Sequence, residues 1–291
     1  MSFIDCHVHI TPPDIEADWE KYAQNEPYFS LLNRSGAASK NGRQFASAQD
    51  VIAVLENEDS LFDRAVVFGF AFKDAGLCRY VNDYVIESVK QYPERLTGFC
   101  VVPPKNGGAE SEILRCYGEG LVGVGELFPA GQDFDLENPK DTFSVTKVCK
   151  ELNIPLLLHA NEPIGHHYPG KTAVSLRQIE TFVSGNPGLN IILAHWGGGI
   201  FIYETMPEIK KHFANVYYDT AASPFLYDAR IYDAAKALCL CGKVFFGSDF
   251  PLLSAGRYMS AIEESALTND EKRLIMGENV KKLLKICRNT P

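Results

Sequence analysis

The sequence predicts an α/β protein folded as a single (β/α)8 barrel of the TIM type. Short apolar runs suited to strands alternate with amphipathic stretches suited to helices along nearly the whole chain, and such alternation is typical of a parallel sheet. Eight such units and a length of 291 residues favour one closed barrel domain over residues 1–291. An open doubly wound sheet would need a glycine-rich dinucleotide fingerprint after the first strand, and none follows it.

The expected strands are short runs rich in Val, Ile, Leu and Phe. They lie at about 2–8, 64–70, 95–102, 121–126, 154–159, 189–195, 215–219 and 243–248. The expected helices lie at about 49–58, 76–91, 109–117, 139–152, 171–185, 200–213 and 227–240, with a helical tail from about 257. Asp50, Asn138 and Asp228 are of the residue types that begin helices.

One segment does not fit the alternation. Residues 11–48 are rich in Pro, Ser, Gly and Asn, and we expect them to form a long loop inserted over the barrel mouth. No linker, repeat or low-complexity tract divides the chain into further domains.

Composition limits the partners and the compartment. The net charge of −9 disfavours a nucleic-acid surface, and no apolar stretch has the length of a membrane span. The N-terminus lacks the pattern of a signal peptide, and the eight cysteines include no CxxC pair, so they are expected to be buried thiols in a reducing cytoplasm. We therefore expect a cytoplasmic protein that binds a small-molecule substrate; a homo-oligomer is an open alternative to a monomer.

The first strand carries the strongest chemical signal, the run Asp5-Cys6-His7-Val8-His9. Alternate strand residues share a face, so both imidazoles would point together into the mouth of the barrel, where the active sites of this fold lie. Two neutral imidazoles at this spacing can bind one divalent cation. The alternative is a pair of surface histidines at the end of a strand.

Three later strands end in the same kind of side chain. Apolar runs lead to His159, His195 and Asp249, each followed by small or loop-forming residues. Closure of a barrel brings all strand ends to one mouth, so these ligand types are expected to meet there. Asp219, which ends the seventh strand, could line the pocket or brace a ligand histidine.

These segments resemble the amidohydrolase superfamily. DCHVHI, LAHWGGG and FGSDFP are similar to the amidohydrolase-related, aminocarboxymuconate-semialdehyde decarboxylase-like branch, and the tail IMGENVKKLL resembles its closing helix. The resemblance implies a metal-dependent, hydrolase-like barrel in which His7, His9, His159 and Asp249 surround a metal. It also implies that His195 is a second-metal ligand or an acid–base residue, and that Asp249 is a catalytic proton acceptor.

Glu126 leaves the number of metal ions open. It ends the fourth strand in the segment GVGELF, which resembles a segment of TatD-type metal-dependent nucleases. A carboxylate at this strand commonly bridges two metals, so Glu126 could bridge a second ion, bind substrate or pair with a nearby histidine. We expect one divalent ion or two, zinc first, with manganese or iron as alternatives.

The loop after the fifth strand, HANEPIGHHYPGK, is the expected substrate-recognition loop. Its candidate substrate residues are Glu162, His166, His167 and Lys171, of which a histidine or the lysine would bind an anionic group. The alternative for each residue is a place in a solvated, turn-rich connection.

Two enzymatic functions and one binding function follow. The first is a hydrolase in which metal-activated water attacks a carbonyl, ester or lactone of a small carboxylate-bearing substrate, with Asp249 moving the proton and His195 polarising the oxygen. The alternative is a non-oxidative decarboxylase of an aromatic or unsaturated carboxylic acid. A non-catalytic metal-binding or ligand-sensing barrel would be of another class, and the almost complete ligand set disfavours it.

Overall fold

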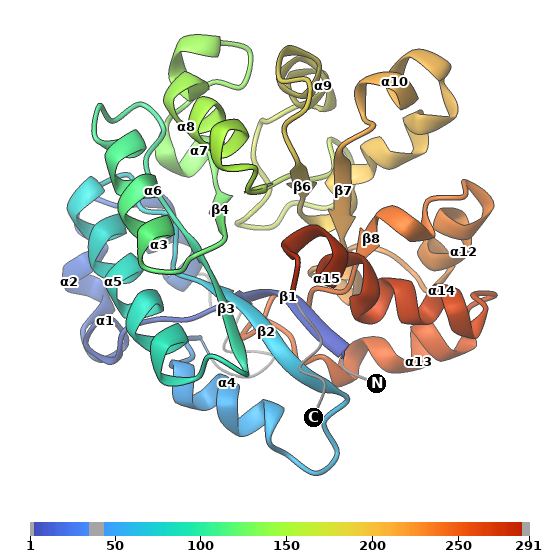
Figure 1. The fold of residues 1–291 in the computed structure, drawn as a ribbon, viewed down its shortest axis with the longest axis horizontal. Coiled ribbons are helices and arrows are strands. Elements are labelled where there is room, and N and C mark those ends of the chain that lie inside the picture. The colour runs from blue at the N-terminus through green and yellow to red at the C-terminus, as the bar shows by residue number, and fades with distance from the viewer. Residues whose placement is uncertain (1–2, 35–43, 287–291) are drawn as a thin grey trace.

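A computed structural model describes residues 3–34 and 44–286 (Figure 1). Eight parallel strands follow one another around the sheet in chain order, so the predicted barrel is confirmed. They are β1 (Phe3–His9), β2 (Phe62–Phe68), β3 (Leu96–Cys100), β4 (Gly123–Leu127), β5 (Leu156–Leu158), β6 (Ile191–Leu193), β7 (Val216–Asp219) and β8 (Val244–Phe245). The chain after β8 pairs with β1, since the backbone N–H of Cys6 donates to Phe246 and that of His9 to Phe250, both at 2.8 Å.

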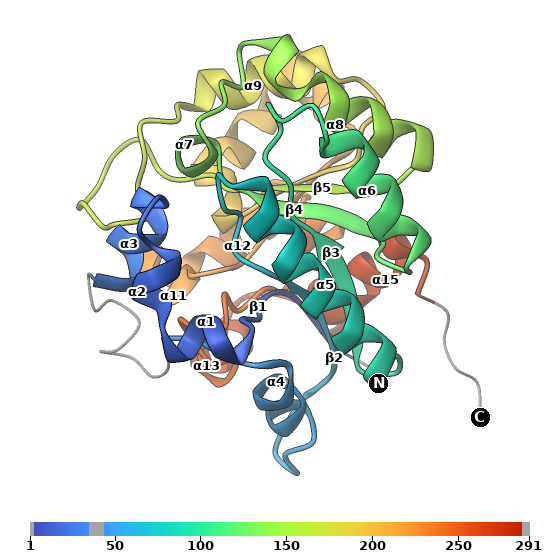
Figure 2. The same cartoon turned by 90° about the vertical axis from the view of Figure 1, so that its left-hand side faces the viewer.

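Helices surround the strands on the outside (Figures 1 and 2). They are α4 (Ala48–Leu55), α5 (Ala75–Gln91), α6 (Ala109–Gly118), α8 (Pro139–Leu152), α9 (Leu176–Gly185), α10 (Pro207–His212), α12 (Arg230–Ala237), α13 (Gly256–Glu264), α14 (Asn269–Arg273) and α15 (Asn279–Leu284). Two further single turns are α7 (Pro129–Gln132) and α11 (Ser223–Leu226). Among the described helices, none has the length and apolar character needed to cross a bilayer.

Of the three residues expected to begin helices, one is the N-cap of its helix. Asn138 caps α8 and accepts a hydrogen bond from the backbone of Lys140. Asp50 instead lies inside α4, where it completes a capping box with Ser47, the residue that begins the helix. Asp228 precedes α12 by two residues and accepts from the backbone of Arg230.

Two expected helices begin or divide elsewhere. The helix expected from 171 begins at 176, because residues 171–175 belong to the loop that follows β5. The helix expected over 200–213 is interrupted at Met206, and Pro207 begins α10 at a position that proline favours.

The expectation of a loop over 11–48 is wrong for the part that the structure describes. Pro13, Pro27 and the residues after them form three short helices, α1 (Pro13–Ala17), α2 (Trp19–Tyr22) and α3 (Pro27–Arg34). Their apolar side chains, among them Ile15 and Phe29, pack in one cluster with residues beyond β2 and β4, including Phe72 and Phe128. The carboxylate of Glu26 ties the segment down by accepting the backbone N–H groups of residues 73 and 74 at 2.8 Å. Residues 35–43 lie outside the described chain.

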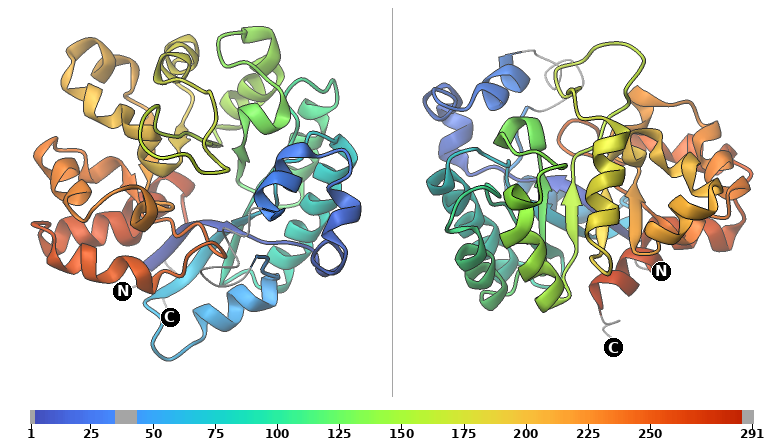
Figure 3. Two further views of the ribbon diagram at one scale, coloured as in Figure 1. Left: turned by 180° about the vertical axis from the view of Figure 1, so that it is seen from behind. Right: turned by 90° about the horizontal axis from the view of Figure 1, so that it is seen from above.

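These helices lie on the same side of the barrel as the loop after β5. Figure 3 (right) shows α1–α3 beside that loop at the end of the barrel towards which the strands run. The predicted placement of the segment at the mouth is therefore consistent with the structure, although its helices were not foreseen.

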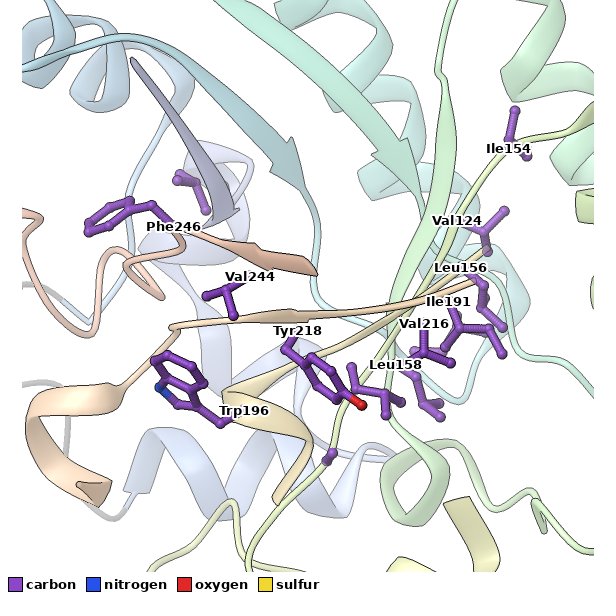
Figure 4. Close-up of a cluster of buried hydrophobic side chains, with 14 of the residues drawn as sticks. Val124, Ile154, Leu156, Leu158, Ile191, Trp196, Val216, Tyr218, Val244 and Phe246 are labelled. Atoms are coloured by element: carbon purple, nitrogen blue, oxygen red, sulfur yellow. The ribbon is translucent and has the colours of Figure 1, made fainter. Parts of the chain in front are cut away.

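The core lies on both sides of the strands. Figure 4 shows the outer layer, where Val124, Leu156, Ile191 and other strand residues meet the helices. A second cluster takes one or more residues from six strands, among them Phe68 and Phe99, with Val280 of α15 packed against them. Phe68 of this cluster contacts both histidines of β1. The centre of its ring lies 5.1 Å from that of His7 and 4.8 Å from that of His9.

Two charged networks, one buried and one partly exposed, connect neighbouring units. Glu204, which is 5% exposed, accepts hydrogen bonds from the Tyr218 hydroxyl at 2.8 Å and from Lys243 Nζ at 2.7 Å. Between α5 and α6, Glu112 accepts two hydrogen bonds from Arg115, at 2.8 and 2.6 Å, and one from Asn82 at 3.0 Å. Burial alone would raise the pKa of Glu112, but these hydrogen bonds lower it below the usual value.

The cysteines are mostly core thiols, as expected. Cys6, Cys78, Cys100, Cys116, Cys149 and Cys241 are buried and free. Cys239 is exposed, because a left-handed residue at this position ends the α12 region at the surface, so the expectation was wrong there. Cys287 lies outside the described residues.

Candidate metal centre and active site

Two histidines and two carboxylates meet at the carboxyl ends of β1, β4 and β8. His7 Nε2 lies 3.5 Å from Glu126 Oε2 and 3.6 Å from Asp249 Oδ1. His9 Nε2 lies 3.6 Å and 3.3 Å from the same two oxygens. The backbone N–H of Asp249 donates to the carbonyl of His7 at 2.9 Å, which holds the chain after β8 against β1. The strand-end pattern therefore brings these four side chains together as the sequence predicts.

Two groups of three side chains among the described residues could hold a divalent metal, and they share His7. One is His7, His9 and Asp249, the other is His7, Glu126 and His195, and in each group the ligand atoms lie within 4.8 Å of one another. Ligands about 2.0–2.1 Å from a tetrahedrally coordinated zinc lie about 3.3–3.4 Å from one another, and the four distances between the imidazoles and the carboxylates are 3.3–3.6 Å. His7 Nε2 is fully buried and has no hydrogen-bond partner among the described residues. A buried polar atom in that state is costly unless it binds a ligand, and neutral imidazole with carboxylate is a common donor set for zinc, manganese and iron.

Asp219 determines which nitrogen of His7 is free. Its Oδ2 lies 2.8 Å from His7 Nδ1, and neither side chain is exposed. Its Oδ1 accepts the backbone N–H groups of His195 at 2.9 Å and Ala221 at 3.0 Å. Because Asp219 accepts from Nδ1, the neutral form of His7, which is the form that binds metal, has its lone pair on Nε2, the nitrogen that faces the metal-ligand group. Of the two roles considered for Asp219, the structure shows the bracing one.

His159 reaches the site through Glu126. Its Nδ1 lies 3.0 Å from Glu126 Oε1, and its Nε2 lies 3.0 Å from the carbonyl oxygen of Gly170 in the loop after β5. Both ring nitrogens thus have protein partners in the structure. The role of His159 as a direct metal ligand stays a prediction.

Glu126 faces four histidines with its two oxygens. Oε2 lies near His7 and His9, whereas Oε1 lies 3.0 Å from His159 Nδ1 and 3.4 Å from His195 Nε2. Glycine precedes it because Gly125 has φ +124°, and a Cβ there would lie 2.2 Å from the carbonyl oxygen of residue 157. A side chain at position 125 would therefore displace the backbone that presents Glu126.

His195 is the first residue of a left-handed turn that follows β6. Residues 195–199 all have positive φ, from 55° to 90°. A Cβ at Gly198 would lie 2.2 Å from the carbonyl oxygen of Asn161, so glycine is needed where this turn packs against the loop after β5. His195 Nδ1 lies 3.0 Å from the carbonyl oxygen of Ala221, which leaves Nε2 facing Glu126.

The buried charges shift the ionisation of the site. Burial alone would lower the pKa of His7, but the charges of Asp219 and Glu126 raise it well above its ordinary value. Burial would raise the pKa of Asp249, yet the hydrogen bond from His9 and the charge of His7 lower it to about 2. Burial would likewise raise the pKa of Glu126, but the charges of His7 and His159 lower it well below its ordinary value. Both carboxylates are therefore anionic at neutral pH, as metal ligands must be.

The four candidate substrate residues of the loop after β5 differ in their exposure and in their contacts. His166 and His167 are exposed. Lys171 Nζ donates to the backbone carbonyls of Ile164 and, at 3.2 Å, of His166, so it closes the loop on itself. Glu162 is half-buried and accepts the Tyr168 hydroxyl at 2.9 Å.

Two residues near this loop were not foreseen. Asn161 is fully buried and accepts the backbone N–H of Thr172 at 3.0 Å and its hydroxyl at 2.9 Å, which joins the two ends of the loop. The Tyr227 hydroxyl is buried beside Gly199 and has no hydrogen-bond partner among the described residues. Neither residue follows an apolar strand run in the way that marked the ligands, so the sequence carries no signal for them.

A (β/α)8 barrel with two histidines and two carboxylates at its mouth defines a class of metal-dependent enzymes. The chain belongs to the amidohydrolase family: the family model described as amidohydrolase matches residues 4–286. The resemblance seen in the sequence is thereby confirmed, and the family assignment indicates an enzyme.

Individual relatives cover the whole chain. A 2-amino-3-carboxymuconate-6-semialdehyde decarboxylase from Dictyostelium discoideum is 27% identical over 98% of this chain and 92% of its own length. The crystal structure of 5-carboxyvanillate decarboxylase from Sphingomonas paucimobilis matches with a TM-score of 0.77 and 16% identity over 98% of this chain and 99% of that one. A dihydroxybenzoic acid decarboxylase from Polaromonas sp., with bound manganese and the inhibitor 2-nitroresorcinol, matches with a TM-score of 0.71 and 16% identity over 98% and 97% of the two chains.

Proposed function

We propose that this protein is a metal-dependent, non-oxidative decarboxylase of a small aromatic or unsaturated carboxylic acid. The observation that carries the proposal is the similarity to the Dictyostelium decarboxylase over 98% of the chain. This favours the second of the two enzymatic functions expected from the sequence over the first.

The ion would be held by His7, His9, Asp249 and Glu126 Oε2, with His159 as a further proposed ligand. When bound, a divalent cation orients the substrate and stabilises negative charge on its oxygens. The donor set suits zinc, manganese or iron, and the manganese in the Polaromonas relative favours manganese or zinc here. We propose one ion per chain; a measured value near two would mean that Glu126 bridges a second ion towards His159 and His195.

His195 is the proposed proton donor. Decarboxylation replaces a carbon–carbon bond with a carbon–hydrogen bond, so a proton must reach the carbon that bears the carboxylate. His195 Nδ1 is directed at the Ala221 carbonyl at 3.0 Å, and that carbonyl can only accept. The nitrogen that can exchange a proton is therefore Nε2, which faces the site. After protonation, the electron pair of the breaking bond returns to the π system of the product and CO₂ leaves.

Hydrolysis is the second candidate, and Glu126 is the observation that favours it. A second carboxylate beside Asp249 gives the site two groups that could accept a proton from an attacking water. In that reaction Asp249 would take the proton, and His195 would donate a hydrogen bond to the oxygen on which charge develops.

The two reactions are separated by the product. Protein loaded with Mn²⁺ or Zn²⁺ is incubated with hydroxybenzoates, unsaturated dicarboxylates, lactones and esters, and CO₂ release is measured for each. We expect CO₂ in one-to-one yield with the decarboxylated product, and deuterium from D₂O at the carbon that lost the carboxylate. We expect His195→Asn to lower kcat by roughly 10²–10⁴ with little change in KM, whereas the exposed Glu208→Gln leaves both unchanged. Opening of a lactone or ester with no CO₂ from any acid would show that hydrolysis is the reaction.

A further inference from the structure

A polar cluster of three side chains lies next to the metal-ligand group on its loop side. We name Glu162, Tyr168 and Tyr227 the recognition cluster. Glu162 Oε2 accepts the Tyr168 hydroxyl at 2.9 Å, but its Oε1 is buried with no hydrogen-bond partner among the described residues. The Tyr227 hydroxyl is buried and without such a partner too.

Tyr168 experiences the charges of both Glu162 and Asp249. Burial raises the pKa of Tyr168, the charge of Glu162 raises it further, and the charge of Asp249 adds to the effect. Burial, then the charge of Glu162 and then a hydrogen bond with that carboxylate raise the pKa of Tyr227, so the phenol is positioned to donate to Glu162.

The backbone fixes the position of this cluster. Glu162 follows Asn161, which joins the ends of the loop and packs against the left-handed turn at Gly198. The same loop is joined to the metal centre where His159 Nε2 meets the carbonyl of Gly170 at 3.0 Å. The carboxylate of Glu162 is therefore held in place before substrate arrives, and holding it in place reduces the entropic cost of binding.

The cationic side chains of the loop have other contacts in the structure. Lys171 Nζ donates to carbonyls of its own loop and lies 5.7 Å from the centre of the Tyr168 ring, and His166 and His167 are exposed. Among the described residues, no lysine or arginine forms an ion pair with Glu126, Glu162 or Asp249. That His166, His167 or Lys171 binds an anionic group stays a prediction. Glu162 Oε1 lies near the Tyr227 hydroxyl, and a carboxylate oxygen has room for a second donor.

We propose that Glu162 is a specificity-determining residue that accepts a hydrogen bond from a hydroxyl or amino group of the substrate. The substrate is then a carboxylic acid that carries such a donor on the side away from the metal, rather than one that carries a second carboxylate there. The inference rests on the proposed function in placing the first carboxylate at the metal. A site built to bind a hydroxyl group discriminates strongly against an analogue without it, because its buried acceptor is left unpaired.

Calorimetric titration of the Mn²⁺-loaded protein tests this without turnover. The probes are 3- and 4-hydroxybenzoate, the matching methoxybenzoates, and isophthalate and terephthalate as dicarboxylates. We expect at least one hydroxybenzoate to bind at least tenfold more tightly than its methoxy partner and than the dicarboxylate. In Glu162→Gln this preference falls at least tenfold and the dicarboxylate binds more tightly, because the carboxamide is neutral and can also donate. Glu208→Gln, which removes the same charge from the exposed face of α10, leaves the preference as in the unchanged protein.

A second variant covers the case in which Glu162→Gln does not fold. Tyr168→Phe removes the hydroxyl that orients Glu162, and we expect it to reduce the preference in the same titration. Equal affinities for the hydroxy and methoxy acids, no binding of either hydroxybenzoate, or a preference that both variants leave intact would overturn the inference. A preference that is present in the absence of any CO₂ release would leave this inference standing and overturn the proposed reaction instead.

Discussion

Replacing Asp219 by asparagine should weaken metal binding although Asp219 does not face the metal. Three N–H donors converge on this carboxylate: His7 Nδ1 at 2.8 Å, the backbone of His195 at 2.9 Å and the backbone of Ala221 at 3.0 Å. A carboxylate offers acceptors to all three. A carboxamide offers one oxygen and one NH₂ group. In either orientation its NH₂ group therefore faces an N–H donor, either that of His7 or those of the backbone at His195 and Ala221.

The expected loss of metal affinity follows from the carboxamide orientation that costs less free energy. The amide oxygen would keep the two backbone donors, and its NH₂ group would face His7, which must then accept at Nδ1 and hold its proton on Nε2. A protonated Nε2 cannot bind metal. Losing a partner that orients a metal-bound histidine typically lowers metal affinity about 10–100-fold, which corresponds to about 1.4–2.8 kcal/mol. Because Asp219 is fully buried, we also expect the unfolding free energy of the metal-free protein to fall by about 1–3 kcal/mol.

The assay is a competition titration with a chromophoric chelator, in Zn²⁺ and in Mn²⁺, on protein freed of metal. Asp228→Asn, an exposed aspartate that pairs with Arg230, is the matched control and should keep the affinity of the unchanged protein. If Asp219→Asn binds either metal within about threefold of that affinity, the argument that Asp219 sets the tautomer of His7 is refuted.

Three changes away from the ligands test the packing that presents them. Gly198→Ala should lower the unfolding free energy by more than about 2 kcal/mol, since the left-handed backbone costs alanine about 1–2 kcal/mol and its Cβ would lie 2.2 Å from the Asn161 carbonyl; urea unfolding measures this. Lys243→Met should cost about 3–5 kcal/mol by the same assay, because it leaves Glu204 buried without its charged partner. Glu112→Gln should lower the melting temperature more at pH 7 than at pH 3. The depressed pKa of Glu112 means that its contribution is present above its unfolded-state pKa and is lost as the pH falls through the folded-state value.

Each of these changes has a control. Gly242 has no heavy atom within 4 Å of the place where a Cβ would lie, so Gly242→Ala should change stability little. Adding Glu204→Gln to Lys243→Met should recover part of the loss, and a double variant less stable than the single one would contradict the ion-pair explanation. A destabilisation by Glu112→Gln that is as large at pH 3 as at pH 7 would show that shape, not charge, accounts for it.

The periodicity of apolar residues predicted the barrel because each strand must be buried on both faces. It failed for the described part of residues 11–48, where α1–α3 have only four to eight residues. Helices this short are not stable by their own hydrogen bonds; here Ile15 and Phe29 belong to one buried cluster with Phe72. Such packing joins distant parts of the chain, and no local pattern encodes it.

In the site too, some contacts could be predicted from the sequence and others could not. His7, His9, Glu126 and Asp249 could be predicted to meet, because strand ends in a barrel converge whatever the loops do. The partners of these residues could not all be predicted. That His159 would contact Gly170, and that Tyr227 would lie beside Glu162, depends on loop conformations held by buried hydrogen bonds such as those of Asn161.

We propose that His7 and His9, together with Glu126 and Asp249, hold a divalent metal. Elemental analysis of the purified protein and of the double variant His7→Ala with His9→Ala tests it most directly. We predict about one Zn²⁺ or Mn²⁺ per chain in the unchanged protein, and none in the variant at equal helical content by circular dichroism. A folded double variant that keeps its full complement of metal would contradict the account.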